Sequence, residues 1–78
     1  MKILAFGIVK ELFAGRSIDV IVTDGLTVAG LQARLEEQYP GLKQLKSFAI
    51  AVNGEYANPA TIIKEGDEVA IIPPVSGG

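Results

Sequence analysis

The sequence of 78 residues contains no cysteine and no histidine. The chain therefore cannot form a disulfide, a Cys or His zinc site or a haem ligand, although small domains often depend on one of these for stability. The same absence leaves no Ser-His or Cys-His pair for nucleophilic catalysis, and no side chain that ordinarily titrates near neutral pH. We expect packing alone to hold the fold, no metal or cofactor to be bound, and the chain not to be catalytic by itself.

An excess of one charge and a long apolar run are also missing. Seven Lys and Arg stand against nine Asp and Glu, which gives a formal net charge of −2 without any basic run. Nucleic acid is a poor candidate partner because its recognition depends on clustered cations. The apolar runs fall far short of the roughly 20 residues of a membrane-spanning helix. We expect no membrane association and a cytoplasmic location.

What remains is the composition of a small globular domain. Apolar residues make up 49% of the chain and charged residues 21%, which is typical of folded rather than disordered proteins. A chain of this length forms one domain with a thin core.

Two segments near the N-terminus predict a β-hairpin. Residues 1–9 are a run of strand length with β-branched and aromatic residues, and residues 17–22 are a second such run. The intervening residues 10–16 contain Gly15 and polar neighbours, which suit a turn.

One amphipathic helix is predicted after the hairpin. Thr27 supplies an N-cap hydroxyl, and Pro40 with Gly41 ends the pattern. Between them, apolar residues recur at helical spacing, namely Val28, Leu31, Leu35 and Tyr39. Gly30 either marks a close approach of this helix to the sheet or is a tolerated cost of about 1 kcal/mol, and the sequence leaves both interpretations open.

The second half of the chain predicts the rest of the sheet. After one further helical turn at Leu42 and Leu45, residues 48–53 form a strand that ends at an Asn-Gly turn. Residues 56–63 are a loop or short edge strand, and residues 68–72 form the last strand. This order describes an α+β fold, the β-grasp or ubiquitin-like arrangement, with a mixed sheet and one main helix packed on one face.

Alternation along the first and last strands predicts which face of the sheet is open. Lys2 places Leu4 and Phe6 on the outer face, because a lysine does not point into the core. Glu68 places Ile72 outward in the same way. If these strands are neighbours, Phe6 and Ile72 form an exposed apolar patch of the kind that marks a protein partner. Scattered surface apolar residues without a function are the alternative.

The most informative segment is the end of the chain. Pro73 and Pro74 stop the last strand and are followed by Val75, Ser76, Gly77 and Gly78. Two glycines at a given end occur by chance in roughly half a percent of chains. Such a tail enters a channel that a Cβ would block, and residues 75–78 reach roughly 13 Å when extended. We therefore divide the chain into a domain of residues 1–74 and a flexible tail of residues 75–78; a frayed end or an expression remnant is the alternative.

Residues 71–78, Ile-Ile-Pro-Pro-Val-Ser-Gly-Gly, follow Glu-Gly-Asp-Glu-Val at positions 65–69. Together they resemble the end of the small subunit of molybdopterin synthase, and Phe6 with residues 9–12 resembles its first-strand segment. The resemblance covers essentially the whole chain. Lys10 departs from it, because that family often has Arg there, and the region of residues 53–63 varies widely within the family.

The resemblance implies a sulfur carrier whose Gly78 carboxylate is adenylated by an ATP-dependent, ubiquitin-activating-like adenylyltransferase and then converted to a thiocarboxylate. It implies that the tail residues Val75, Ser76 and Gly77 enter a channel of the synthase large subunit, in a heterotetramer that builds the dithiolene of molybdopterin. The residues that we expect to contact the partner are Phe6, Tyr56, Ile72, Pro73 and Pro74.

Three other functions stay open. A thiazole-pathway sulfur carrier has a similar fold and end but lacks the Pro-Pro-Val that precedes the tail here. A ubiquitin-like modifier of protein lysines uses the same kind of end, and a passive β-grasp binding module needs no reactive terminus. The acidic residues around Gly66 lack the spacing of a calcium loop and are interpreted as a solvated turn.

Overall fold

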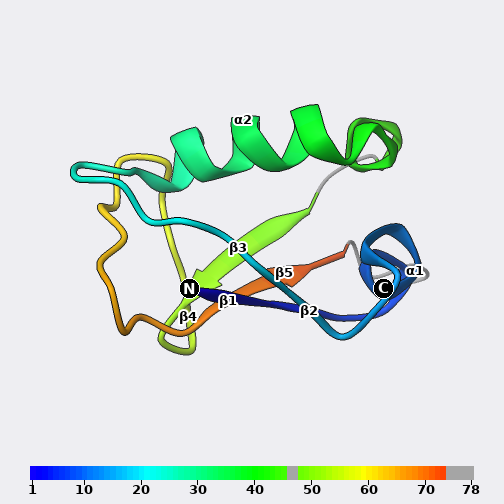
Figure 1. The fold of residues 1–78 in the computed structure, drawn as a ribbon, viewed down its shortest axis with the longest axis horizontal. Helices are drawn as coiled ribbons and strands as arrows, with labels where there is room; N and C mark the ends of the chain where they lie inside the picture. The colour runs from blue at the N-terminus through cyan, green and yellow to red at the C-terminus, as the bar shows by residue number, and fades with distance from the viewer. Residues whose placement is uncertain (46–47, 74–78) are drawn as a thin grey trace.

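The computed structural model describes residues 1–45 and 48–73. Along the chain, its elements are β1 (Lys2–Ala5), α1 (Ile8–Phe13), β2 (Ser17–Asp19), α2 (Val28–Gln38), the 3-10 helix η1 (Pro40–Gln44), β3 (Ala49–Val52), β4 (Glu55–Tyr56) and β5 (Val69–Ile72). The five strands form one sheet in the order β2-β1-β5-β3-β4, and α2 lies across one of its faces (Figure 1).

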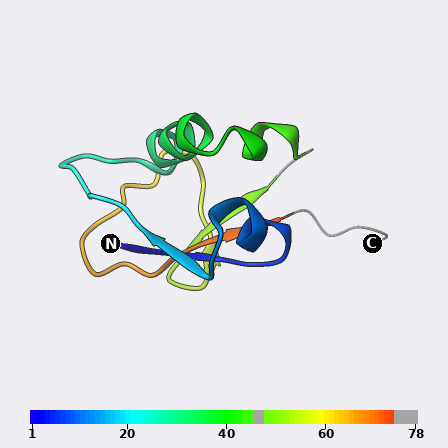
Figure 2. The same ribbon diagram turned by 45° about the vertical axis from the view of Figure 1, so that its right-hand side comes forward.

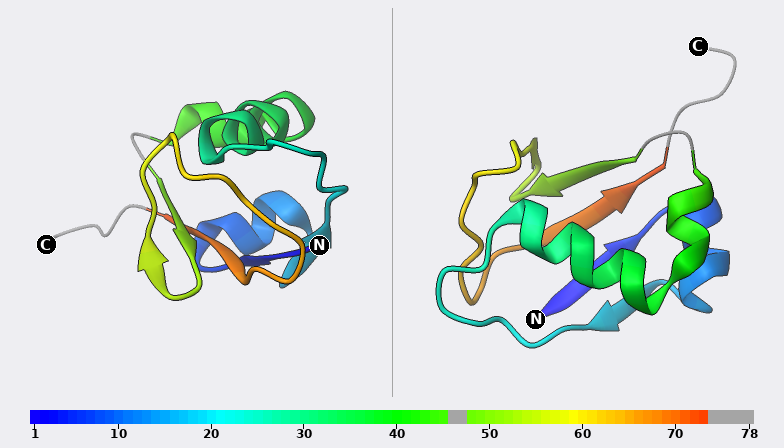
Figure 3. Two further views of the ribbon diagram at one scale, coloured as in Figure 1. Left: turned by 90° about the vertical axis from the view of Figure 1, so that its left-hand side faces the viewer. Right: turned by 90° about the horizontal axis from the view of Figure 1, so that it is seen from above.

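The sheet is mixed. The first and last strands, β1 and β5, are parallel neighbours, and the other neighbouring pairs are antiparallel. The helices lie on the same side, so within the described residues the opposite face of the sheet carries no helix (Figure 3). The predicted α+β class and β-grasp arrangement are confirmed.

The predicted N-terminal hairpin was wrong in its bounds. Strand β1 ends at Ala5, and helix α1 occupies most of the predicted turn. Gly7 breaks the strand with φ 56° and ψ −134°, a conformation that a side chain disfavours. The helix buries Val9 and Phe13, which are four residues apart, and ends at Ala14 in the left-handed conformation. Figure 2 shows α1 at the end of the sheet where β1 and β5 finish.

Helix α2 begins and ends as predicted. The Thr27 hydroxyl accepts a hydrogen bond of 3.1 Å from the Gly30 N–H, and η1 with its fully buried Leu42 supplies the expected further turn. A Cβ on Gly30 would lie 3.4 Å from Leu26 and Thr27 side-chain atoms, in the segment leading into the helix. Gly30 is therefore not a point of close contact between helix and sheet. Of the two interpretations, the one that agrees with the structure is a glycine whose cost to helix stability is tolerated.

The core lies between the sheet and the helices α1, α2 and η1. Its fully buried aliphatic side chains come from every layer, namely Ile3, Val9, Leu31, Leu35, Leu42, Ile63, Val69 and Ile71. Phe13 of α1 packs against Tyr39 with ring centroids 4.7 Å apart. This contact joins α1 to the end of α2. Within the described ranges, no helix is long and apolar enough to cross a membrane.

Candidate functional site: the open sheet face and the root of the tail

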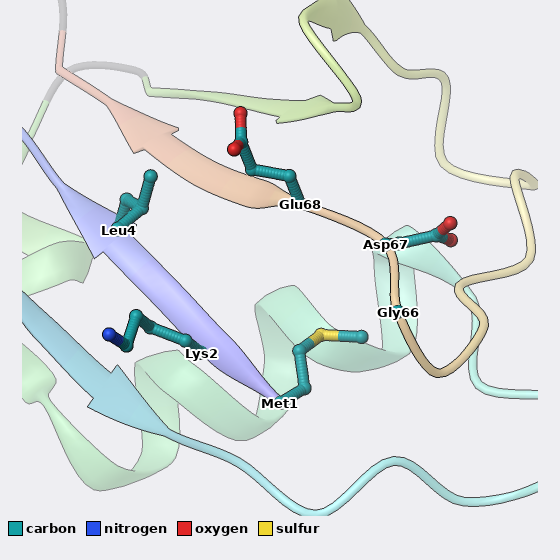
Figure 4. A pocket seen from close by; sticks show the side chains of 6 residues that line it. All are labelled: Met1, Lys2, Leu4, Gly66, Asp67 and Glu68. Carbon is teal, nitrogen blue, oxygen red and sulfur yellow. The ribbon is translucent and has the colours of Figure 1, made fainter.

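The face of the sheet opposite α2, here called the open face, carries the side chains predicted for it. In β1, Ile3 and Ala5 are buried against the helices, whereas Lys2 is exposed and Leu4 is half-buried. In β5, Val69 and Ile71 are likewise buried, and Ala70 and Ile72 are half-buried. Figure 4 shows Lys2, Leu4 and Glu68 on one side of the sheet, with α2 behind it. The alternation around Lys2 and Glu68 therefore identified the open face correctly.

The strand register aligns one residue from each strand into a row across the open face. The members of this middle row are Ser17, Leu4, Ala70, Ala51 and Tyr56. Two alanines occupy its centre, and Tyr56 stands at the edge strand with 74% of its surface exposed. The centre of the open face therefore carries only short, apolar side chains, so side chains of a partner can approach close to the backbone of the sheet.

Phe6 and Ile72 lie next to this row, toward the C-terminal end of the chain. The last registered pair of the parallel strands β1 and β5 is Ala5 with Ile71, and Phe6 and Ile72 are the residues that follow this pair. Phe6 is exposed, with 46% of its surface accessible. Ile72 is less exposed than Phe6 and pairs with Ala49 of β3. Both predicted partner residues thus follow the same end of the β1–β5 pair, with Ile72 less exposed than expected, and their joint patch stays a prediction. Tyr56 belongs to the other edge of the same face.

The root of the tail rests on the first turn of the chain. A Cβ built on Gly7 would lie 2.9 Å from Cγ of Pro73, so the two residues are in direct contact. Pro73 is the last residue that the structure describes. Pro74, Val75, Ser76, Gly77 and Gly78 lie outside the described residues, and their predicted roles and the domain bound at residue 74 stay predictions.

A hollow beside Phe6 contains two cationic residues that the sequence interpretation had not assigned to any site. It is lined by Leu4, Ala5, Phe6, Lys10 and Arg16. Helix α1 supplies Lys10, and the Ala5 N–H donates a hydrogen bond of 2.8 Å to the Arg16 carbonyl, which holds Arg16 beside β1. The spacing of Val9 and Phe13 was the available signal for α1, and hence for this hollow.

A second hollow lies at the other end of the open face and is lined by Met1, Lys2, Leu4, Gly66, Asp67 and Glu68 (Figure 4). The Asp67 carboxylate accepts hydrogen bonds from the Lys64 N–H at 2.8 Å and from the Asn53 amide at 3.1 Å. The backbone hydrogen bond from Lys64, followed by the one from Asn53, lowers the pKa of Asp67 below 3.8. This carboxylate closes a turn. In the part of the chain that the structure describes, no three Asp or Glu side chains gather as metal ligands.

Comparison with known proteins gives the family. The sequence model of the ThiS family matches residues 3–78. The chain belongs to the ThiS family. It is 42% identical to the molybdopterin synthase sulfur carrier subunit of Dictyostelium discoideum, with 99% of this chain and 94% of the relative covered. Identity to the proteins of the same name is 33% in Arabidopsis thaliana and 32% in Homo sapiens, over 100% of this chain and 82% and 93% of those relatives.

Solved structures from the same comparison agree with the fold. SAMP1 from Haloferax volcanii superposes with a TM-score of 0.83 at 29% identity, covering 100% of this chain and 98% of that chain. Subunits 1 and 2 of the molybdopterin-converting factor from Helicobacter pylori were solved as a protein–protein complex. A chain of that complex superposes at a TM-score of 0.69 with 28% identity, covering 99% of this chain and 96% of that chain.

Proposed function

We propose that this ThiS-family chain is the sulfur-carrier subunit of a molybdopterin synthase and delivers sulfur as a thiocarboxylate on Gly78. The observation that carries the proposal is the similarity, at 32–42% identity over nearly the full chain, to proteins named molybdopterin synthase sulfur carrier subunit. The Pro-Pro-Val-Ser-Gly-Gly end of the sequence supports it.

The chemistry assigned to the terminus needs no acid or base from this chain. A carboxylate becomes electrophilic once it carries a good leaving group, so a partner adenylyltransferase joins it to the α-phosphate of ATP and releases pyrophosphate. Hydrosulfide then attacks the acyl carbon and AMP departs, and loss of the S–H proton leaves the thiocarboxylate. That group is a soft nucleophile, and a dry partner channel that holds it in line accounts for sulfur transfer to the pterin precursor.

The described geometry supports separate roles for the open face, which docks a partner, and for the tail, which carries the sulfur. The open face offers Leu4, Phe6 and Tyr56 to a partner, and β5 leads the chain from this face directly to the root of the tail at Pro73. The complex of two subunits among the structural neighbours supports a large subunit as that partner. We propose the same face for docking to the adenylyltransferase, a heterotetrameric synthase, and a cytoplasmic location.

The test is reconstitution. Purified chain is activated with ATP, an adenylyltransferase and a sulfur source, and is then mixed with the large subunit and the cyclic pyranopterin precursor. We expect one molybdopterin to form for every two activated termini, because the dithiolene holds two sulfur atoms and each terminus delivers one. A chain that binds the large subunit and still yields no molybdopterin after activation would contradict the proposal.

A second function, covalent attachment to other proteins, is favoured by one observation. Structures of small archaeal modifier protein 1 superpose on this chain with TM-scores of 0.79 to 0.82 at 26% identity. Intact-mass analysis of the protein from its native host separates the two functions. A carrier shows sulfur in place of one oxygen, whereas a modifier shows covalent adducts. The thiazole-pathway carrier is disfavoured by Pro73 and Pro74.

A further inference from the structure

We propose that the hollow at Leu4, Ala5, Phe6, Lys10 and Arg16 receives a carboxylate side chain of the large subunit, and that this ion pairing fixes the orientation in which the carrier docks. The inference rests on the proposed function, because it concerns the same partner. It adds the chemistry that this partner must present beside the apolar contact.

The hollow combines an apolar floor with a cationic rim on rigid backbone. Leu4 and Ala5 belong to β1, and Phe6 follows directly. The Lys10 N–H donates to the Gly7 carbonyl at 3.1 Å, and the Arg16 carbonyl accepts from Ala5 at 2.8 Å. Both cationic residues are thus tied by their backbones to the start of the chain, while their side chains are exposed.

The hollow at Lys2 and the hollow at Lys10 and Arg16 differ in charge. Lys2 shares its hollow with Asp67 and Glu68, so its charge is opposed within the domain (Figure 4). The lining of the hollow at Lys10 and Arg16 contains no acidic residue. One end of the open face is therefore mixed in charge, and the end beside the root of the tail is cationic.

When a partner buries Phe6, the difference in charge between the two hollows affects binding. A partner surface that covers Phe6 also removes water from the neighbouring cations, and a cation loses solvation unless an opposite charge replaces the water. A partner carboxylate meets this need. The Arg16 guanidinium can hold such a group with two parallel hydrogen bonds, whereas Lys10 contributes a single point charge.

The asymmetry also selects one docking orientation. If the partner turned end for end on the open face, its carboxylate would meet Asp67 and Glu68, with Lys2 beside them, instead of Lys10 and Arg16. Lys2 would offset only part of the repulsion from these two acidic groups, so the mixed end of the face receives a carboxylate less favourably than the cationic end. The cationic hollow therefore directs the end of the face that carries Pro73, and with it the start of the tail, toward one place on the large subunit.

The experiment measures the affinity of the intact carrier for the purified large subunit by calorimetry over a series of salt concentrations. The double variant Lys10→Gln and Arg16→Gln is compared with Lys43→Gln, which removes an exposed lysine from η1 on the helical layer. We expect the double variant to bind about tenfold more weakly or worse at low salt, with a shallower salt dependence, and Lys43→Gln to bind as the wild type does. Arg16→Gln alone gives the same direction if the double variant does not fold.

Two results would overturn the inference. One is a double variant whose affinity and salt dependence equal those of a wild-type chain that does bind the large subunit. The other is a loss confined to the adenylyltransferase, measured in parallel. Failure of the wild-type chain itself to bind the large subunit would instead remove the proposed function, so the two failures are distinguishable.

Discussion

Gly7 and Pro73 are packed so closely that a Cβ on Gly7 would lie 2.9 Å from Cγ of Pro73. Gly7 has φ 56° and forms the N-cap of α1, while Pro73 follows the last strand directly. The place where the chain leaves the sheet toward its tail is therefore set by a contact with the first turn of the chain. Only a residue without a side chain fits both the backbone angles and the space.

Substitution of Gly7 tests this contact. Gly7→Val forces a β-branched residue into a positive φ and against Pro73, so we expect it to cost about 1–3 kcal/mol of stability and to shift the root of the tail. Gly25→Val is the matched control, because Gly25 has φ 76° with nothing within 4 Å of the added Cβ. Urea unfolding should show a loss in both variants, whereas molybdopterin synthesis by folded protein should fall only in Gly7→Val. Equal activity of the two variants would contradict a role for the contact.

The apolar contact of the open face is tested at Phe6. We expect Phe6→Asp to weaken binding of the large subunit by about 2 kcal/mol or more, since it places a charge where an anchor is buried. Ile62→Asp is the control, because Ile62 is 54% exposed but pairs with Thr27 outside the five-stranded sheet. Calorimetric titration of both variants measures the difference, and an unchanged affinity of Phe6→Asp would refute the assigned face.

Asp67 predicts a pH dependence of stability. Its pKa is lowered below 3.8 in the folded chain by the hydrogen bonds from Lys64 and Asn53, so the ionised carboxylate stabilises the fold above the pKa of the unfolded chain. That contribution is lost as the pH falls through the lower, folded pKa. Asp67→Asn should therefore unfold at a lower urea concentration than the wild type at pH 7, and the difference should shrink below a pH of about 3.8. A difference that is the same at both pH values would show that ionisation of Asp67 is irrelevant.

The fold was predictable where the sequence carries a periodic pattern or a charged marker. Lys2 and Glu68 identified the open face because a strand alternates strictly between its two sides. Helix α2 was predicted from its N-cap at Thr27 and from three apolar residues that are buried in the structure.

Helix α1 was missed because its apolar residues continue the β-branched run of β1 and the helix has only six residues. Glycine adopts many conformations, so the break at Gly7 was not evident either. Two features depend on tertiary structure. One is the hydrogen bond between Asn53 and Asp67, which are 14 residues apart, and the other is the shared hollow of Lys10 and Arg16. For the hollow, the spacing of Val9 and Phe13 was the one local signal, and it indicates only the helix.

The position of the terminal carboxyl is tested by shortening the tail. Deletion of Gly78 moves that group back by roughly 3.3 Å, which exceeds the tolerance of in-line attack, so synthase activity should vanish while folding and subunit binding persist. Gly77→Ile keeps the carboxyl in place and adds a branched side chain within the proposed channel, so thiocarboxylation and molybdopterin formation should both fall. A chain ending at Gly77 that supports normal synthesis would show that the terminus is an ordinary end.

The most direct measurement is the intact mass of the chain before and after incubation with ATP, the adenylyltransferase and a sulfur source, with fragmentation to locate any change. The account predicts that one oxygen is replaced by sulfur and that the replacement maps to Gly78. An unchanged mass, under conditions in which the same adenylyltransferase activates a known carrier, would contradict the claim that this chain carries sulfur on its own C-terminus.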